Sequence, residues 1–152
     1  MTFREKILLS SMAITLVIWG WYFTGFIGAL KAGRIDQGEA TGDFVLAVIV
    51  LTVIHIVMAT LVAIFSPKSA NAPADDREKA YAIAAYRPAY FILSAAVVTT
   101  MLAGPVLLRI AGEMKLDPEL APVVLGNAML AALVLAELVH SGFQLVRFRI
   151  GG

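Results

Sequence analysis

Four long stretches without charge constrain this chain more than any other feature. Ile7–Leu30, Phe44–Pro67 and Pro88–Leu108 contain no charged residue, and Leu120–Val146 contains only Glu137. About 20 apolar residues suffice to cross a hydrocarbon core of ~30 Å as a helix. Lipid offers the backbone no hydrogen-bonding partner, so runs of this kind become helices. The pattern therefore predicts four membrane-spanning helices.

The chain has 152 residues and 60% of them are hydrophobic, which exceeds the roughly 45–50% of soluble domains. We expect an all-α membrane protein, a four-helix transmembrane bundle forming one domain over residues 1–152. Its predicted helices cover about 5–30, 44–66, 76–111 and 120–148. The first run is long and has no small-x-small cleavage site, so we expect it to stay as a helix. The absence of cysteine excludes disulfides and thiolate metal sites.

The basic residues predict the orientation in the membrane. Eight of them fall on one side of the predicted helices and four on the other. The larger group is Arg4, Lys6, Lys68, Arg77, Lys79, Arg87, Arg147 and Arg149, and the smaller is Lys31, Arg34, Arg109 and Lys115. The positive-inside rule then places both termini in the cytoplasm. We expect a multi-pass protein of a bacterial or archaeal inner membrane. Its net charge of +1 argues against nucleic acid as a partner.

The outer side of the first two helices carries aromatic residues and a glycine-rich connection. Trp19, Trp21 and Tyr22 are typical of interfacial anchors, with stacking on a cofactor as the alternative. Lys31–Gly42 has the composition of a turn-rich loop. Asp43 is then the expected N-cap of the second helix.

The third helix is predicted to begin well before its apolar part. Asp75 and Glu78 have the spacing of a capping box at the cytoplasmic surface. This charged start is either an ordinary solvated helix end or a docking site for a cytoplasmic regulatory protein. The docking candidates are Asp75, Asp76, Arg77, Glu78, Lys79 and Arg87.

Small residues recur every four positions in the last two helices. The rows are Ala95-Thr99-Ala103, Ala96-Thr100-Gly104 and Ala128-Ala132-Ala136. Such rows let helices pack closely in lipid, so we expect these two helices to be tight neighbours. His140 continues the third row and should therefore point at the seam between them.

The fourth helix also carries an intramembrane polar cluster of Glu137, His140, Ser141 and Gln144, with Asn127 in its outer half. One interpretation is interhelical hydrogen bonding, including across a homodimer. A second is a proton- or ligand-responsive site, because the pKa values of buried Glu and His are easily moved. A third is a metal or haem site.

The metal and haem interpretation has specific requirements. Glu137 and His140 form one Glu-x-x-His, whereas di-iron bundles need two copies, so a dimer would have to complete the site. Haem held by His55 and His140 is conceivable. Their expected depths differ, however, with His55 ~16 Å from either end of its run and His140 ~10 Å from the cytoplasmic end. We predict no cofactor.

Catalytic motifs are missing from the sequence. There is no HExxH, no Walker motif, no GxSxG and no cysteine pair. No repeated acidic ring suggests an ion filter. We therefore predict a protein that is not an enzyme.

Two stretches carry a resemblance to a known family. Asp75-Asp76-Arg77-Glu78 leads on to Arg87-Pro88-Ala89-Tyr90, and Asn127-Ala128-Met129-Leu130 leads on to Leu135-Ala136-Glu137-Leu138-Val139. Together they resemble a family of small, uncharacterised prokaryotic membrane proteins with four predicted helices. Members of that family begin the third helix with Asp-Glu-Arg-Asp, where this chain has Asp-Asp-Arg-Glu. The resemblance implies no activity, and it suggests a regulatory partner that is a small helix-turn-helix protein.

The expected function is that of a regulatory or partner-binding membrane subunit. Its expected partners are the bilayer, a second copy of the chain and a cytoplasmic regulatory protein. Two alternatives stay open. One is a haem- or metal-binding redox protein that uses His140, His55 or Glu137. The other is a small proton-linked transporter or channel that depends on Glu137.

Overall fold

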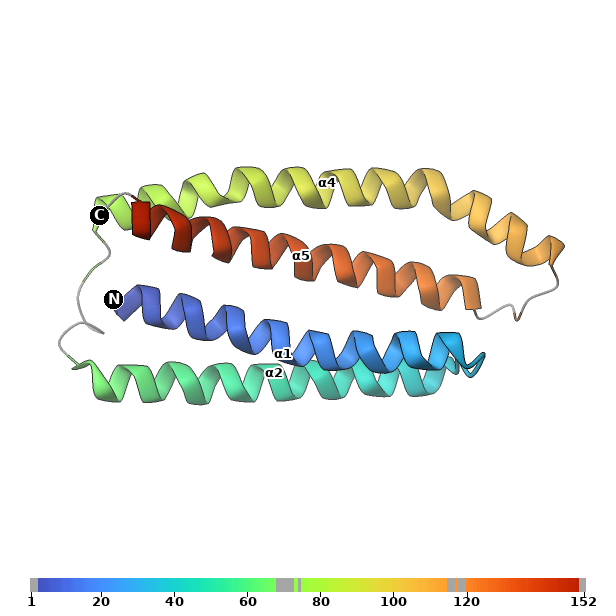
Figure 1. Ribbon diagram of the computed structural model, residues 1–152, viewed down its shortest axis with the longest axis horizontal. Coiled ribbons are helices and arrows are strands. Elements are labelled where there is room, and N and C mark those ends of the chain that lie inside the picture. The colour runs from blue at the N-terminus through green and yellow to red at the C-terminus, as the bar shows by residue number, and fades with distance from the viewer. Residues whose placement is uncertain (1–2, 68–72, 74, 115–116, 118–119, 151–152) are drawn as a thin grey trace.

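The computed structural model describes residues 3–67, 73, 75–114, 117 and 120–150, and these residues form four helices. The helices are α1 (Phe3–Lys31), α2 (Gln37–Phe65), α4 (Asp76–Glu113) and α5 (Leu120–Ile150). All four are long and apolar enough to cross a membrane, which confirms the all-α class and indicates a multi-pass membrane protein. Both ends of the chain lie at one end of the molecule, here named the termini end (Figure 1). The other end, where α1 and α4 finish, is named the hairpin end.

The helices lie in the order α2, α1, α5, α4 (Figure 1). Extensive packing joins α1 to α2, α1 to α5 and α4 to α5. Because α2 and α4 are not packed extensively on one another, the four-helix bundle is open between them. The central helices α1 and α5 therefore carry most of the interior contacts.

The start of α2 differs from the prediction. The helix begins at Gln37, and its N-cap is Asp36 rather than Asp43. The Asp36 carboxylate accepts a hydrogen bond of 2.8 Å from the backbone N–H of Glu39. This cap satisfies a free donor of the first turn and outweighs the poor helix propensity of Gly38. Part of the segment assigned to a loop is thus helix. The other predicted boundaries agree with the structure to within about two residues.

The start of α4 confirms the predicted capping box. Glu78 accepts from the backbone N–H of Asp75 at 3.1 Å, and the Asp75 carboxylate caps the helix in return. Glu78 also pairs with Arg4 at 2.7 Å, which ties the beginning of α1 to the beginning of α4. Arg4 is well exposed, so this ion pair contributes about 0.2–1 kcal/mol.

The seam between α4 and α5 confirms that these two helices are tight neighbours. Gly104 is buried, and a Cβ atom built on it would lie 3.8 Å from Leu125. Ala136 is buried on the α5 side. Further along, the ring of His140 lies 4.5 Å from that of Tyr86, as its place in the small-residue row predicted.

The aromatic residues of α1 correct the prediction of an interfacial belt. Trp19 and Tyr22 are buried and form a core cluster with Ala47 of α2. Leu130 of α5 packs on the same cluster. Trp21 alone among the three predicted anchors is exposed, at 55%. The helical repeat explains the difference, since positions 19 and 22 share the inner face of α1 and position 21 lies on the other side.

Candidate functional site

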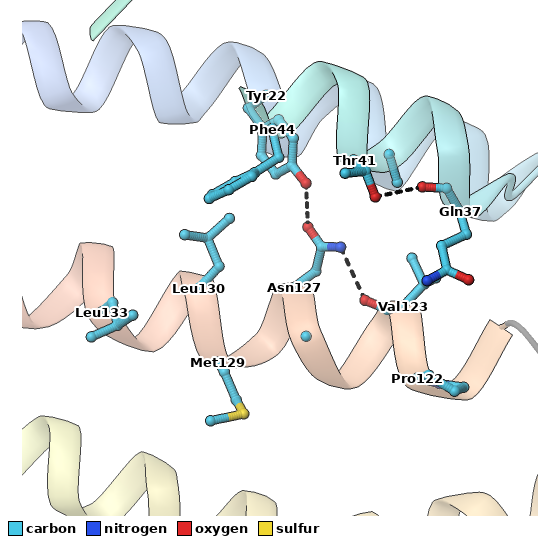
Figure 2. A pocket seen from close by; sticks show the side chains of 12 residues that line it. Tyr22, Gln37, Thr41, Phe44, Pro122, Val123, Asn127, Met129, Leu130 and Leu133 are labelled. Carbon is cyan, nitrogen blue, oxygen red and sulfur yellow. Dashed lines mark hydrogen bonds between the residues drawn. The ribbon is translucent and has the colours of Figure 1, made fainter. Parts of the chain in front are cut away.

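A pocket of about 420 Å³ lies between α2 and α5 at the hairpin end (Figure 2). Tyr22 of α1 contributes to its lining, and the pocket is open rather than enclosed. Its lining is Tyr22, Gln37, Ala40, Thr41, Phe44, Pro122, Val123, Gly126, Asn127, Met129, Leu130 and Leu133. The volume falls within the range of roughly 300–1,000 Å³ that is usual for small-molecule sites.

A hydrogen bond between α1 and α5 joins two residues that line this pocket. The Tyr22 hydroxyl donates to Asn127 Oδ1 at 2.8 Å, and Asn127 Nδ2 donates to the carbonyl of Val123 at 3.0 Å. Figure 2 shows Asn127 pointing from α5 toward Tyr22. The Asn127 amide is therefore held in one orientation by two partners. Tyr22 is only 5% exposed, so its ring and hydroxyl form a fixed wall.

The polarity of the lining changes with depth. On the α2 side, Gln37 and Thr41 lie nearest the hairpin end, where the helix surface would meet the membrane interface, and the apolar Pro122 and Val123 of α5 lie at the same end (Figure 2). Phe44, Leu130 and Leu133 lie one to three turns deeper, and their side chains are apolar (Figure 2). The α2 side of the pocket thus runs from hydrogen-bonding groups at the hairpin end to an apolar side chain below them, whereas the α5 side is apolar except at Asn127.

Gly126 keeps the α5 side of the pocket open. A Cβ atom at this position would meet no atom within 4 Å. The glycine is therefore not required for close helix packing, and its lack of a side chain leaves space in the pocket. Replacement by a large residue would occupy part of the pocket without straining the backbone.

This pocket was not predicted from the sequence, for an identifiable reason. The sequence pattern predicts a loop at Gln37 and Thr41, and it predicts an interfacial position for Tyr22. The signal that could have found the early start of α2 is the spacing of Asp36 and Glu39, which matches a helix cap. No comparable signal pairs Tyr22 with Asn127, because the two are far apart in the sequence.

The residues of the predicted polar cluster of α5 point in three different directions. Ser141 is only 5% exposed and lies on the side of α5 that faces α1. His140 is half-buried against Tyr86 of α4, and Gln144 Nε2 lies 3.2 Å from its Nδ1. The structure therefore brings His140 and Gln144 together and turns Ser141 away from them.

Glu137 lies between these two contact faces and is exposed. Within the described part of the chain its carboxylate makes no ion pair and no hydrogen bond. It therefore stands on the open side of the helix layer, between the strips of α5 that contact α1 and α4. Within the described residues of one copy, this arrangement gives Glu137 no hydrogen bond to another helix.

His140 lies nearer the termini end than His55, in the expected direction, but by only about 3 Å along the bundle. The contact between Tyr22 and Asn127 gives a common reference level for α1 and α5. Ser11 lies eleven residues from that level on α1, a rise of ~17 Å, and His140 lies thirteen residues from it on α5, a rise of ~20 Å. Ser11 Oγ lies 2.9 Å from His55 Nε2, so His55 shares that depth. The two imidazoles nevertheless face different seams, α1/α2 and α4/α5. No group of three metal-binding side chains occurs among the described residues.

The docking candidates at the start of α4 are mostly exposed. Asp76, Arg77, Lys79 and Arg87 present charge to the surroundings, whereas Glu78 is partly buried under Arg4. Lys79 pairs with Asp76 at 3.0 Å on the same helix. These residues form a mixed-charge surface at the termini end, and Asp75 holds its first turn in place.

Comparison of the chain with protein-family models, with curated proteins and with solved structures gave no match. The resemblance to the four-helix prokaryotic family stays a prediction.

Proposed function

We propose that this chain is a membrane-embedded binding protein whose pocket between α2 and α5 takes a neutral single-chain amphiphile from the lipid phase. The observation that carries the proposal is the graded lining of the pocket. An amphiphile in a bilayer has its head at the interface and its chain below, and the α2 side of the lining has the same order from Gln37 to Phe44, with the apolar Leu130 and Leu133 of α5 deeper still.

The lining also specifies the head group. Thr41 donates to the backbone carbonyl of Gln37, and Asn127 is held by Tyr22 and Val123. The exposed side-chain amide of Gln37 remains able to donate and to accept. Among the residues that the structure describes, no charged side chain lines the pocket. A hydroxyl or carbonyl head matches this neutral lining, and a charged head would lack a counter-ion.

The two tryptophans of the chain provide the test. Trp19 stacks on Phe44 at 6.1 Å between ring centroids, and Phe44 lines the pocket. Trp21 is exposed. The variant Trp21→Phe leaves Trp19 as the single reporter, and Trp19→Phe leaves Trp21. Each variant is placed in nanodiscs and titrated with a brominated monoacylglycerol prepared from monoolein, since bromine quenches only nearby indole.

The proposal expects saturable quenching of Trp19 at low probe content. Trp21 should report only the probe dissolved in the bilayer, with quenching that rises steadily and does not saturate. Equal, non-saturating curves for the two reporters would count against a binding pocket, because they would mean that the probe reaches both only as bulk lipid.

The orientation in the membrane belongs to the same proposal. We infer that the termini end is cytoplasmic, which is supported by the eight basic residues assigned to that side against four on the other. The pocket would then open in the outer leaflet. A reporter fused after residue 152 that is active only in the cytoplasm tests this orientation, and activity of a periplasmic reporter there would reverse it.

A second candidate function is docking of an acidic cytoplasmic protein on the start of α4. The favouring observation is that the capping box and the Arg4–Glu78 pair fix this segment while Arg77 and Arg87 stay exposed. Charge reversal of Arg77, Lys79 and Arg87 should abolish capture of such a partner. Charge reversal of Arg109, at the hairpin end, is the matched control. Capture that is unchanged by the triple reversal argues against docking there.

A further inference from the structure

The groove between α4 and α5 has a register that two contacts define. Toward the termini end, the ring of Tyr86 lies 4.5 Å from that of His140. Toward the hairpin end, Leu93 and Leu133 line the same pocket of about 180 Å³. Leu93 follows Tyr86 by seven residues, and Leu133 precedes His140 by seven. The antiparallel helices α4 and α5 therefore keep the same register over two turns.

Tyr90 and Glu137 lie at the same level along this groove. Tyr90 lies four residues after Tyr86 on α4, and Glu137 lies three residues before His140 on α5. Each is thus about one turn from the contact between Tyr86 and His140 and one turn from the apolar pocket. A carboxylate and an aromatic ring flank the same part of the groove.

Neither group has a polar partner in the described part of the chain. Tyr90 is 73% exposed, Tyr86 is 64% exposed and Glu137 is also exposed. Tyr90 and Glu137 make no hydrogen bond or ion pair with the residues that the structure describes. Arg87 is the nearest basic residue along α4, and it lies roughly 60° further round the helix than Tyr90, on the side away from α5.

An ionised carboxylate at this depth would be stabilised by a positive partner. Ionised groups within the hydrocarbon region are costly unless they are paired. An organic cation would supply the missing charge, and the faces of Tyr90 and Tyr86 would attract it as well. Its apolar groups would fit the adjoining pocket, which is lined by Leu93, Ala96, Val97, Thr100, Met129, Ala132 and Leu133. A hydrated metal ion would find too few oxygen ligands in this lining.

We propose that the groove at Glu137 and Tyr90 binds a lipophilic organic cation, such as a quaternary ammonium or phosphonium ion. This site is separate from the pocket between α2 and α5, whose proposed ligand is neutral. The two share Met129 and Leu133 as lining but differ in the groups that would hold a head group.

The test uses the full chain in nanodiscs of zwitterionic phosphatidylcholine, titrated with tetraphenylphosphonium in equilibrium dialysis. We expect saturable binding at one site per chain, weakened at least tenfold by Glu137→Gln. Glu113→Gln is the matched control, because Glu113 is an exposed carboxylate at the far end of α4, and it should bind as the parent does. Tyr90→Leu should weaken binding severalfold, whereas Tyr90→Phe, which keeps the ring, should bind normally.

Two results would overturn the cation site. One is binding that is absent or equally strong in Glu137→Gln. The other is efficient disulfide-linked dimer formation by Glu137→Cys in this otherwise cysteine-free chain, since a second copy would then cover the groove. Neither result bears on the neutral amphiphile, because quenching of Trp19 by brominated monoacylglycerol does not involve Glu137. Failure of one proposal is therefore distinguishable from failure of the other.

Discussion

Ser11 and His55 meet across the α1/α2 seam, with Ser11 Oγ 2.9 Å from His55 Nε2. The other ring nitrogen, His55 Nδ1, lies 3.0 Å from the carbonyl oxygen of Leu51. A carbonyl can only accept, so Nδ1 carries a hydrogen. In the neutral imidazole Nε2 then accepts from the Ser11 hydroxyl. The histidine of α2 is thus satisfied on both sides without a metal or a charge.

Ser11→Ala should lower the free energy of unfolding by about 1 kcal/mol, because it leaves Nε2 of His55 without its donor. The neighbouring Ser10 is the control. Its hydroxyl donates to the carbonyl of Ile7 within the same helix, so Ser10→Ala should cost much less. Unfolding in mixed detergent micelles measures both. Equal losses of unfolding free energy in the two variants would show that the contact with His55 does not contribute to stability.

Asp36→Ala should destabilise the first turn of α2 by about 0.5–2 kcal/mol, the usual cost of a lost N-cap. Asp43→Ala should leave that turn unchanged, since Asp43 lies inside the helix. Hydrogen exchange of the amide of Glu39 measures the difference directly. Faster exchange in Asp43→Ala than in Asp36→Ala would mean that the helix begins where the sequence pattern first indicated.

Tyr22 and Asn127 should show energetic coupling of about 0.5–1.5 kcal/mol in a double-mutant cycle of Tyr22→Phe and Asn127→Leu. The coupling arises because each single variant leaves the other group without its hydrogen bond. Tyr90→Phe, combined with Asn127→Leu, is the control and should be additive, since Tyr90 is exposed and remote. Additivity in the Tyr22 cycle would contradict the contact.

Gly104→Leu should destabilise the protein by about 1–3 kcal/mol through overpacking at the seam with Leu125. Gly112→Leu, on the same helix, should be tolerated, because a Cβ atom at Gly112 meets nothing within 4 Å. The mid-points of thermal unfolding in detergent compare the two. A stable Gly104→Leu would show that α4 and α5 are less closely packed than the structure has them.

The spanning helices, the cap of α4 and the α4/α5 seam could be predicted because each depends on local pattern. Apolar length specifies a helix in lipid, Asp75 and Glu78 lie within one turn, and small residues every four positions mark a packing face. The early start of α2 was missed because Gly38 and Gly42 are typical of a loop. The cap at Asp36 decided that boundary instead.

The candidate site depended on long-range geometry that one sequence does not contain. Hydrophobicity alone could not divide Trp19, Trp21 and Tyr22 between interior and surface. The helical repeat groups Glu137 with Ser141 but does not say which neighbour each faces. The structure separates them because α1 and α4 contact α5 on either side of Glu137, which leaves the carboxylate on the open side.

The central claim is that the space beside Gly126 holds an amphiphile, and filling that space tests it most directly. Gly126→Leu and the matched Gly142→Leu, elsewhere on α5, are both made in the Trp21→Phe background. A leucine side chain at either position begins in open space, so both should fold. Gly126→Leu should abolish saturable quenching of Trp19 by brominated monoacylglycerol, and Gly142→Leu should retain it. Saturable quenching that persists with equal affinity in Gly126→Leu would contradict the account.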